Sequence, residues 1–546
     1  MEFKTLCDVL SDAVERYSDR TAFSLWRGGM EVSYAEVGRR VERVQQMFLE
    51  AGLKPGDRIA LLSSNTPNWG VCYFAITTAG YVVVPIVTDL TTEAIDNIIA
   101  HSEAKALCVS DRLFMKLSKE TLQNFNIVVR TKNLKVLNHR VVEKGEMRRP
   151  QPEDTAAILY TSGTTSQPKG VMLSHRSLVS QLPMIEALFD MSGEDVLLSV
   201  LPLAHSYECT IGFLAPFTRG AQIVYLDKAP VPSVLMPALR EVAPTIMFTV
   251  PLFIEKLYRT EVRKRMLSNI FVRLLGTMDF SRRMLSRRAA KHLTALFGGR
   301  LRIFGIGGAK LDTAVERFLS ESGFNYTMLY GLTETAPLLV GGFCDGHVGS
   351  TGFALKGVET RLDKQSATTG IGELVVKTPS LMSGYYKNEE ATAEVIEADG
   401  WFHTGDLACI DPAGHIYIKG RKKNVIVGPN GENIYPEDIE AVLNEHFAVS
   451  ESVVVERDGM PVAFVHLDRD LLEAHHSDLA ESWRTRPAEW ERFRNDLFVE
   501  MKRYVNARVN PWSRLVDIFE EKNELVKTAS NKIKRYIYND RFKNNL

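Results

Sequence analysis

The feature that most constrains the fold is a repeated alternation of short apolar runs with segments of helical periodicity. Continuous apolar runs of strand length are typical of strands that are covered on both faces. Helices between the strands supply that cover. The pattern therefore predicts an α/β architecture with largely buried sheets. The strand-like runs are residues 59–62, 81–87, 106–109, 156–160, 196–200, 222–226, 245–250 and 301–306.

One of the helices has a recognisable beginning. Ser33 and Glu36 have the spacing of a capping box, in which each side chain accepts a hydrogen bond from an amide at the helix start. Gly52 ends the helical pattern. Apolar residues recur at helical spacing between them, at Val37, Val41, Val44 and Phe48.

Residues 255–297 differ from the rest, because they contain no strand-like run and place many arginines and lysines between apolar positions. We interpret them as amphipathic helices on the surface. A solvated basic face is the ordinary explanation of such a pattern, and a membrane-facing patch is the alternative.

A domain boundary is expected near the basic residues 420–424. Beyond them the pattern changes to that of a small α+β domain. The prediction is a large N-terminal domain of packed sheets and helices over residues 1–422, and a small C-terminal domain over residues 423–546.

Two local signals support the small domain. Pro436 begins a helix whose first turns are acidic, as the helix dipole favours. Asp458 and Gly459 separate the apolar runs 452–456 and 461–467, which predicts a β-hairpin.

Composition and charge give no indication of a nucleic-acid partner or of a membrane span. The 546 residues carry a formal net charge of -1, which gives no indication of a nucleic-acid partner. No apolar run reaches the roughly 18 residues that a membrane span needs. No signal peptide follows Met1, and the six cysteines include no Cys-x-x-Cys pair. We therefore expect a cytoplasmic protein with reduced cysteines, whose contact with a membrane is at most peripheral and at its inner face.

The strongest chemical signal is Tyr-Thr-Ser-Gly-Thr-Thr-Ser-Gln-Pro-Lys-Gly at residues 160–170. An apolar strand leads into a loop of small and hydroxyl-bearing residues that closes with Lys169. Amides, hydroxyls and a mobile cation are groups that bind phosphate oxygens. The spacing is not that of a Walker A loop. From these residues alone, a flexible loop without a ligand is the alternative.

This stretch resembles the phosphate loop of the adenylate-forming (AMP-binding) superfamily, which includes acyl-CoA synthetases, luciferases and the adenylation domains of peptide synthetases. Other motifs resemble that superfamily in the same order, over essentially the whole chain. They are Leu-Pro-Leu-Ala-His-Ser-Tyr-Glu at 201–208, Tyr-Gly-Leu-Thr-Glu-Thr at 330–335, Trp-Phe-His-Thr-Gly-Asp at 401–406, Ile-Lys-Gly-Arg at 418–421 and a lysine motif at 525–535. The chain is most similar to long-chain fatty acid–CoA ligases. The resemblance implies an acyl-CoA synthetase/luciferase-like fold whose small C-terminal domain is mobile.

The resemblance implies a site for ATP and Mg²⁺. Glu334 and Thr161 are expected to bind the Mg²⁺, which prefers hard oxygen ligands. Asp406 is expected to accept hydrogen bonds from the ribose hydroxyls, and Arg421 to reach the ribose or a phosphate. Tyr330 is expected to stack on the adenine. The expected ATP-binding residues are Thr161, Ser162, Gly163, Thr164, Thr165, Lys169, Gly307, Gly308, Ala309, Tyr330, Gly331, Thr333, Asp406 and Arg421.

The same resemblance implies the groups that act on the acid and the thiol. His205 is expected beside the substrate carboxylate, and Lys532 between that carboxylate and the α-phosphate. Lys423 holds the hinge position about which the family rotates its small domain between two half-reactions. The expected catalytic residues are Lys532, His205, Glu334 and Thr161, and the residues expected to line a CoA tunnel are Asn430, Gly431 and Glu432.

The chain departs from the family pattern at a few positions. Ser166 replaces a glycine of the phosphate loop, which costs of order 1 kcal/mol if the backbone there needs a positive φ. In the lysine motif, Asn531 replaces a glycine, a change that positive φ tolerates, and Val526 replaces a proline. Cys209 and Thr210 stand where some long-chain members carry an aromatic gate.

We expect the chain to activate a medium- to long-chain fatty acid with ATP, releasing pyrophosphate, and to transfer the acyl group from acyl-AMP to CoA. Ala204 and His205 replace the aromatic–Asp pair with which peptide-synthetase domains bind an α-amino group, which argues against an amino-acid substrate. A ligase for an acyl carrier protein shares every ATP-binding residue and is the alternative. A nucleotide-binding homologue without catalysis would lack Lys532, Glu334 or Asp406, and all three are present.

Overall fold

The computed structural model describes residues 3–140, 144–161, 169–263, 279–343, 346–429, 432–469, 471–472, 487–527 and 533–543. By their internal contacts, the residues divide into two compact units. Unit 1 comprises Met1–Ala309, Phe318–Thr360 and Val376–Phe402, and unit 2 comprises Lys310–Arg317, Arg361–Val375 and His403–Leu546. The boundary between residues 422 and 423 and the hinge at Lys423 stay predictions.

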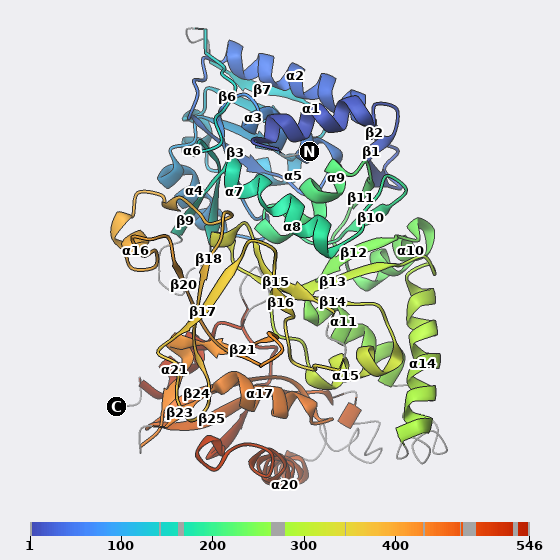
Figure 1. Cartoon of the computed structure of the whole chain (residues 1–546), viewed down its shortest axis with the longest axis vertical. Helices are drawn as coiled ribbons and strands as arrows, with labels where there is room; N and C mark the ends of the chain where they lie inside the picture. The colour runs from blue at the N-terminus through green and yellow to red at the C-terminus, as the bar shows by residue number, and fades with distance from the viewer. Residues whose placement is uncertain are drawn as a thin grey trace. The chain divides into compact units, whose positions relative to one another are not determined.

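The first sheet of unit 1 has parallel strands in its middle and antiparallel pairs at both edges (Figure 1). Among the described residues it contains nine strands in the order β16-β15-β14-β13-β12-β10-β11-β1-β2. In that order they are Phe353–Ala354, Leu338–Gly342, Thr327–Gly331, Ile303–Gly307, Ile246–Thr249, Val196–Ser199, Gln222–Leu226, Thr21–Trp26 and Glu31–Ser33.

The second sheet of unit 1 follows the same plan. Eight strands lie in the order β19-β9-β8-β4-β3-β5-β6-β7 within the part of the chain that the structure describes. Strands β8, β4, β3, β5 and β6 pair in parallel, and the edge strands pair antiparallel. The strands are Gly384–Tyr385, Lys169–Ser174, Thr155–Thr161, Val82–Pro85, Arg58–Leu62, Ala106–Val109, Ile127–Arg130 and Lys135–His139.

Helices connect the parallel strands and build the core of unit 1. Helix α3 is buried along its whole length, and its Trp69 stacks on Tyr73 with ring centroids 5.4 Å apart. Both rings pack edge-on against Phe213. The helices are α1 (Leu6–Arg16), α2 (Tyr34–Glu50), α3 (Pro67–Thr77), α4 (Thr92–Ser102), α5 (Asp111–Phe114), α6 (Lys119–Gln123), α7 (His175–Val179), α8 (Gln181–Leu188), α9 (Ala215–Thr218), α10 (Pro232–Val242), α11 (Pro251–Leu257), α14 (Asp279–Leu296), α15 (Thr313–Ser322, shared with unit 2) and α16 (Glu389–Ala393).

The predicted fold class is confirmed, since a strand falls within or overlaps each of the eight predicted runs. Residues 255–297 contain only helical segments where they are described, and residues 264–278 lie outside the described residues. No helix among the described residues combines the length and the apolar character that crossing a membrane demands.

One of the two hydrogen bonds of the capping box predicted at the start of α2 is confirmed, and the prediction of the other is wrong. The Ser33 hydroxyl accepts from the amide of Glu36 at 3.2 Å, as predicted. The Glu36 carboxylate, however, pairs with Arg39 and Arg40 at 2.9 and 2.8 Å. Two guanidinium groups offer it stronger, charge-assisted hydrogen bonds than a neutral amide does.

Unit 2 contains most of a four-stranded sheet and a three-stranded sheet, counted over the described residues. The predicted hairpin is confirmed, because Arg457 pairs with Met460 across Asp458 and Gly459, both with positive φ. The predicted helix at Pro436 is also confirmed. The strands are β17 (Glu359–Asp363), β18 (Gly372–Lys377), β20 (Phe402–Ile410), β21 (Ile416–Arg421), β24 (Val449–Arg457), β25 (Met460–Leu467), β26 (Asp517–Glu520) and the short pair β22 (Ile426–Val427) and β23 (Asn433–Ile434). The helices are α17 (Pro436–Glu445), α20 (Pro487–Asn506) and α21 (Arg535–Lys543).

Candidate active site

The predicted phosphate loop connects two strands of unit 1 whose ends are paired. Thr161 is the last residue of β8 and lies opposite Lys169, the first residue of β9. Residues Ala156–Leu159 of β8 are all buried, and the pairing of β8 with β9 fixes the position of both residues. The predicted ligands Ser162, Gly163, Thr164 and Thr165, and with them Ser166, lie outside the described residues.

A tyrosine that sequence reasoning missed joins Lys169 to Glu334. The Lys169 ammonium lies 4.7 Å from the centroid of the Tyr385 ring. The Tyr385 hydroxyl donates to Glu334 Oε1 at 2.9 Å. Unit 1 therefore places the predicted phosphate cation and the predicted Mg²⁺ carboxylate against one side chain, although Lys169 begins a strand of the second sheet and Glu334 lies in a turn between two strands of the first.

The turn that carries Glu334 is held from inside the core. Gln181 is fully buried, and its side-chain amide donates to the carbonyls of Thr335 at 3.1 Å and Leu338 at 2.9 Å. Its carbonyl accepts from the amide of Leu338 at 3.0 Å. On the other side, the amide of Met382 donates to the carbonyl of Glu334 at 2.7 Å. The backbone on both sides of Glu334 is therefore fixed.

The residues predicted for the adenine gather at the ends of two neighbouring parallel strands. Gly307 ends β13 opposite Leu329 of β14, and Tyr330 is the next residue of β14. Gly308 has a φ of +90°, and Ala309 follows it on the exposed surface. Gly331 admits no side chain, since a Cβ atom there would lie 1.8 Å from the carbonyl oxygen of Pro337.

The predicted acyl-site motif reaches the same turn. His205 lies half-buried in the turn after β10. The hydroxyl of the next residue, Ser206, lies 3.5 Å from the hydroxyl of Thr333. The structure therefore brings the His205 segment next to the motif that contains Thr333 and Glu334.

A buried acid follows His205 by one turn. Glu208 begins a π-helical segment, Glu208–Leu214, all of whose residues are buried. Burial raises the pKa of Glu208 to about 8, against the opposing effect of a 2.5 Å hydrogen bond from the Ser199 hydroxyl. This carboxyl group is therefore protonated at neutral pH. The motif contained the residue, but nothing in the sequence indicated complete burial.

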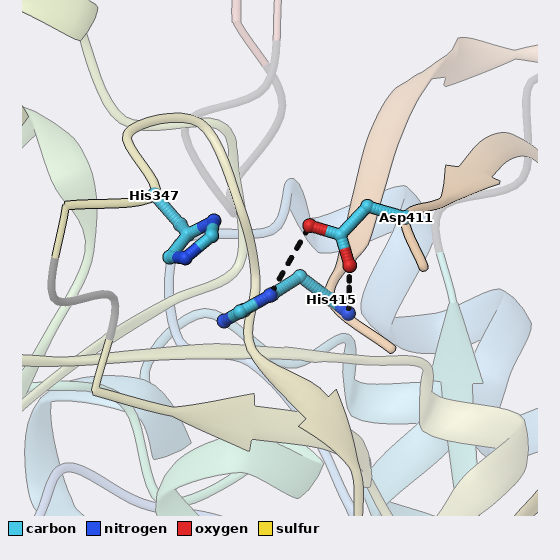
Figure 2. A group of neighbouring side chains, drawn as sticks. All are labelled: His347, Asp411 and His415. Atoms are coloured by element: carbon cyan, nitrogen blue, oxygen red, sulfur yellow. Dashed lines mark hydrogen bonds and ion pairs between the residues drawn. The ribbon is translucent and has the colours of Figure 1, made fainter. Parts of the chain in front are cut away.

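The predicted ribose residues form an ion pair in unit 2. Asp406 on β20 lies directly opposite Arg421 on β21, and Arg421 Nε lies 2.8 Å from Asp406 Oδ1. The Asp406 side chain is buried, which strengthens its attraction to a cation. The turn between the two strands is closed by Asp411, whose carboxylate accepts from the backbone amide of His415 at 2.9 Å and lies 3.2 Å from its Nδ1 (Figure 2).

Three neighbouring residues of unit 2 are of types that bind metal ions, but their other contacts explain why they lie together. One ligand atom each from Asp363, Glu373 and His403 lies within 4.8 Å of the others. The ammonium of Lys422, however, lies 2.6 Å from Glu373 Oε2, and the amide of Gly405 donates to Oε1 at 3.2 Å. We interpret the cluster as an ion-pair network that supports the strands carrying Asp406 and Arg421.

The remaining predicted residues also belong to unit 2. Lys423 lies exposed in the turn Lys422–Asn424, and the carbonyl of Glu432 accepts from the amide of Gly428 at 2.8 Å. Asn430, Gly431 and Lys532 lie outside the described residues. The two ends of the segment that contains Lys532 are nonetheless fixed, because Lys527 pairs with Ile533 in an antiparallel bridge.

Comparison with known proteins decides the family. A profile of the AMP-binding enzyme family matches residues 10–386. The chain belongs to this family. Two relatives and one solved structure illustrate how similar known proteins are to this chain.

Long chain acyl-CoA synthetase 1 of Arabidopsis thaliana is 29% identical over 510 residues, which cover 82% of this chain and 76% of that protein. A feruloyl-CoA synthase of an Amycolatopsis species is 28% identical over 456 residues, covering 81% and 83%. The crystal structure of ATP-bound MatB from Rhodopseudomonas palustris matches 98% of each chain with a TM-score of 0.77 at 23% identity, which shows the common fold. The two relatives are named for making CoA derivatives of acids, and the MatB structure holds ATP.

Proposed function

We propose that this protein is an AMP-forming acid–CoA ligase that uses ATP and CoA, and that it activates a medium- to long-chain fatty acid. The observation that supports adenylation at the predicted residues is the contact of Lys169 and Glu334 with one tyrosine, Tyr385. The choice of a fatty acid rests on the long-chain acyl-CoA synthetase among the relatives. Ala204 and His205, in place of an aromatic–Asp pair, oppose an amino-acid substrate.

The ATP-dependent step is the attack of the acid's carboxylate on the α-phosphorus, with pyrophosphate as the leaving group. Negative charge increases on the phosphate oxygens as the bond to pyrophosphate breaks, and cations and donors placed there stabilise it. Lys169 supplies a cation at the phosphates, together with the loop that begins at Thr161. Asp406 holds the ribose, Arg421 reaches the ribose or a phosphate, and Lys532 joins the acid's carboxylate to the α-phosphate.

The donors proposed for Mg²⁺ suit that ion. Glu334 offers a carboxylate oxygen and Thr161 a hydroxyl, and both are hard oxygen ligands. The bound ion would neutralise charge on the phosphates. Glu334 is half-buried and engaged at Oε1 by Tyr385, so its carboxylate has a fixed orientation.

In the second step the thiol of CoA attacks the carbonyl carbon of acyl-AMP, and AMP leaves. We assign His205 to the position beside the substrate's carboxylate, which becomes the acyl carbonyl of acyl-AMP. We assign Lys423 to the hinge between the two half-reactions, and residues 430–432 to the passage for CoA. Lys423 lies in a short turn between β21 and β22, a place where a few residues can absorb a backbone change.

An aromatic acid is the second candidate substrate, because a feruloyl-CoA synthase is also among the relatives. Release of AMP is measured with ATP, Mg²⁺ and straight-chain acids from acetate to stearate, with ferulate and benzoate alongside, each with and without CoA. The proposal predicts a CoA-stimulated maximum between medium and long chains. If AMP release were greatest with the aromatic acids, an aromatic acid would replace the fatty acid as the proposed substrate. If fatty acids released AMP but CoA did not accelerate that release, an acyl carrier protein would be favoured as the acceptor.

A further inference from the structure

Tyr385 contacts two groups of opposite charge, and it is held by strand pairing and by a backbone hydrogen bond. Strand β19 pairs with β9, so that Tyr385 lies opposite Val171, two residues after Lys169. The amide of Tyr385 donates to the hydroxyl of Thr392 at 2.9 Å. The side chain is buried among these strands, with the whole residue only 7% exposed.

We propose that Tyr385 is a positioning residue for the ATP-dependent step, which orients the Glu334 carboxylate through its hydroxyl and the Lys169 ammonium through its ring. This inference rests on the proposed roles of Lys169 and Glu334. It assigns to a residue outside the predicted motifs the task of holding together a cation on a strand of the second sheet and an anion on a turn of the first.

The hydroxyl of Tyr385 makes a contact that filling the space with an aromatic ring would not provide. A phenylalanine would fill the same volume, but only the phenol donates to Glu334 Oε1, at 2.9 Å. A hydrogen bond to a carboxylate is charge-assisted and directional. With Oε1 held by Tyr385, rotation of the carboxylate about its last bond is restricted, and the orientation of Oε2 is determined as well.

The ring acts on the cation. The Lys169 ammonium lies 4.7 Å from the ring centroid, within the range of a cation–π interaction. A long lysine side chain samples many rotamers when it is unsupported, and ordering it costs entropy. The ring offsets part of that cost before any nucleotide binds. A cation over the ring also polarises the phenol, which strengthens its hydrogen bond to Glu334.

The two tasks can be separated by two substitutions. Tyr385→Phe keeps the ring and removes the hydroxyl, whereas Tyr385→Leu removes both. Tyr386→Phe is the matched control, because it removes a hydroxyl from the neighbouring residue, whose ring contacts His101 and Lys387 instead. Glu334→Gln is the reference for loss of the carboxylate.

The measurement is the Kd for ATP, determined by calorimetry once with EDTA and once with Mg²⁺. The acid substrate is left out, so that no turnover occurs. The ratio of the two Kd values gives the gain in affinity that Mg²⁺ provides. Tyr385→Phe should reduce that gain about tenfold, the lower end of what loss of an outer-shell partner costs, and leave the Kd in EDTA unchanged. Tyr385→Leu should in addition weaken binding in EDTA about fivefold, through the lost support of Lys169.

The outcomes separate this inference from the function on which it rests. The proposed role of Tyr385 is supported if Mg²⁺ no longer increases the affinity for ATP in either Tyr385→Phe or Glu334→Gln. Tyr386→Phe should be unchanged, and circular dichroism should show that all variants are folded. A full Mg²⁺ gain in Tyr385→Phe together with its loss in Glu334→Gln would overturn the role of Tyr385 alone. A full gain in Glu334→Gln would overturn the Mg²⁺ role of Glu334, and the inference with it.

Discussion

Glu208 shows how burial changes the chemistry of one residue. Its carboxyl group is fully buried, hydrogen-bonded to Ser199, and lies against Gly212, where an added Cβ atom would be 2.6 Å from the Glu208 Cδ. An ionised carboxylate in such a place is strongly disfavoured, so burial raises the pKa of Glu208 from 4.5 to about 8. The folded chain keeps a proton that the unfolded chain has lost at neutral pH.

The stability of the protein should therefore fall as pH rises from about 4.5 to about 8, the window between the unfolded and the folded pKa of Glu208, and this contribution should stay constant above it. Glu208→Gln, which mimics the protonated acid, should remove that contribution. The measurement is the difference in apparent Tm between the wild-type protein and the variant across this range. A difference that does not change with pH would contradict the buried, protonated state.

Asp406 is a second residue whose role depends on burial, since its side chain is almost wholly enclosed and paired with Arg421. We expect Asp406→Asn to raise the KM for ATP about tenfold, the cost of weakening charge-assisted hydrogen bonds to the ribose, and to leave the KM for CoA unchanged. Steady-state kinetics with Asp399→Asn, an exposed acid, as the control checks this. An unchanged KM for ATP would show that the ribose lies elsewhere.

At the scale of elements, Gln181 on α8 fixes the turn between β14 and β15 on which Glu334 lies. Replacing its side chain by Leu should leave the backbone groups of Thr335 and Leu338 buried without partners. The free energy of unfolding should fall by about 2–3 kcal/mol. Denaturant unfolding followed by fluorescence measures this, with Gln46→Leu, an exposed glutamine, as the control. Equal stability of both variants would mean that the turn holds its shape without Gln181.

The elements themselves were largely predictable from the sequence, because local patterns determine them. Apolar runs such as 106–109 and 222–226 match β5 and β11 residue for residue. The dipeptide Asp458-Gly459 identified its hairpin because a two-residue turn of type I′ needs positive φ at both positions, and both residues have it. Strand β19, with only two residues, has no such pattern and was missed.

The contact between Tyr385 and Glu334 escaped sequence reasoning for a different reason. The two residues are separated by 51 positions, and neither local spacing nor periodicity links them. Only the pairing of β19 with β9 brings Tyr385 to the site. Resemblance identified Lys169, Glu334 and Asp406 as candidates, but the residues that orient them depend on packing between distant segments.

At the scale of the whole molecule, the proposal divides the work between two units. The segment that contains Lys532 belongs to unit 2, and its ends are tied by the bridge between Lys527 and Ile533. Lys527 is itself held by Glu451 at 2.6 Å. The fixed positions of Lys527 and Ile533 limit where Lys532, which comes directly before Ile533 in the chain, can lie.

Lys532→Ala should reduce formation of acyl-AMP at least about 100-fold, as removal of one charge-stabilising donor does. Thioester formation from supplied acyl-AMP and CoA should stay near the wild-type rate, because that step does not need this lysine. Single-turnover kinetics of each step checks this, and Lys534→Ala, a nearby lysine of the same motif, is the control. Equal loss in both steps would exclude the division of labour between two arrangements of the site.

The most direct test of the account follows the oxygen atoms of the acid. The fatty acid that releases most AMP is prepared with ¹⁸O in both carboxyl positions and converted by the enzyme with ATP and CoA, and the released AMP is analysed by mass spectrometry. Attack of the carboxylate on the α-phosphorus predicts one ¹⁸O atom in each AMP formed and none in pyrophosphate. Unlabelled AMP, or label in pyrophosphate or inorganic phosphate, would contradict activation through an acyl-adenylate.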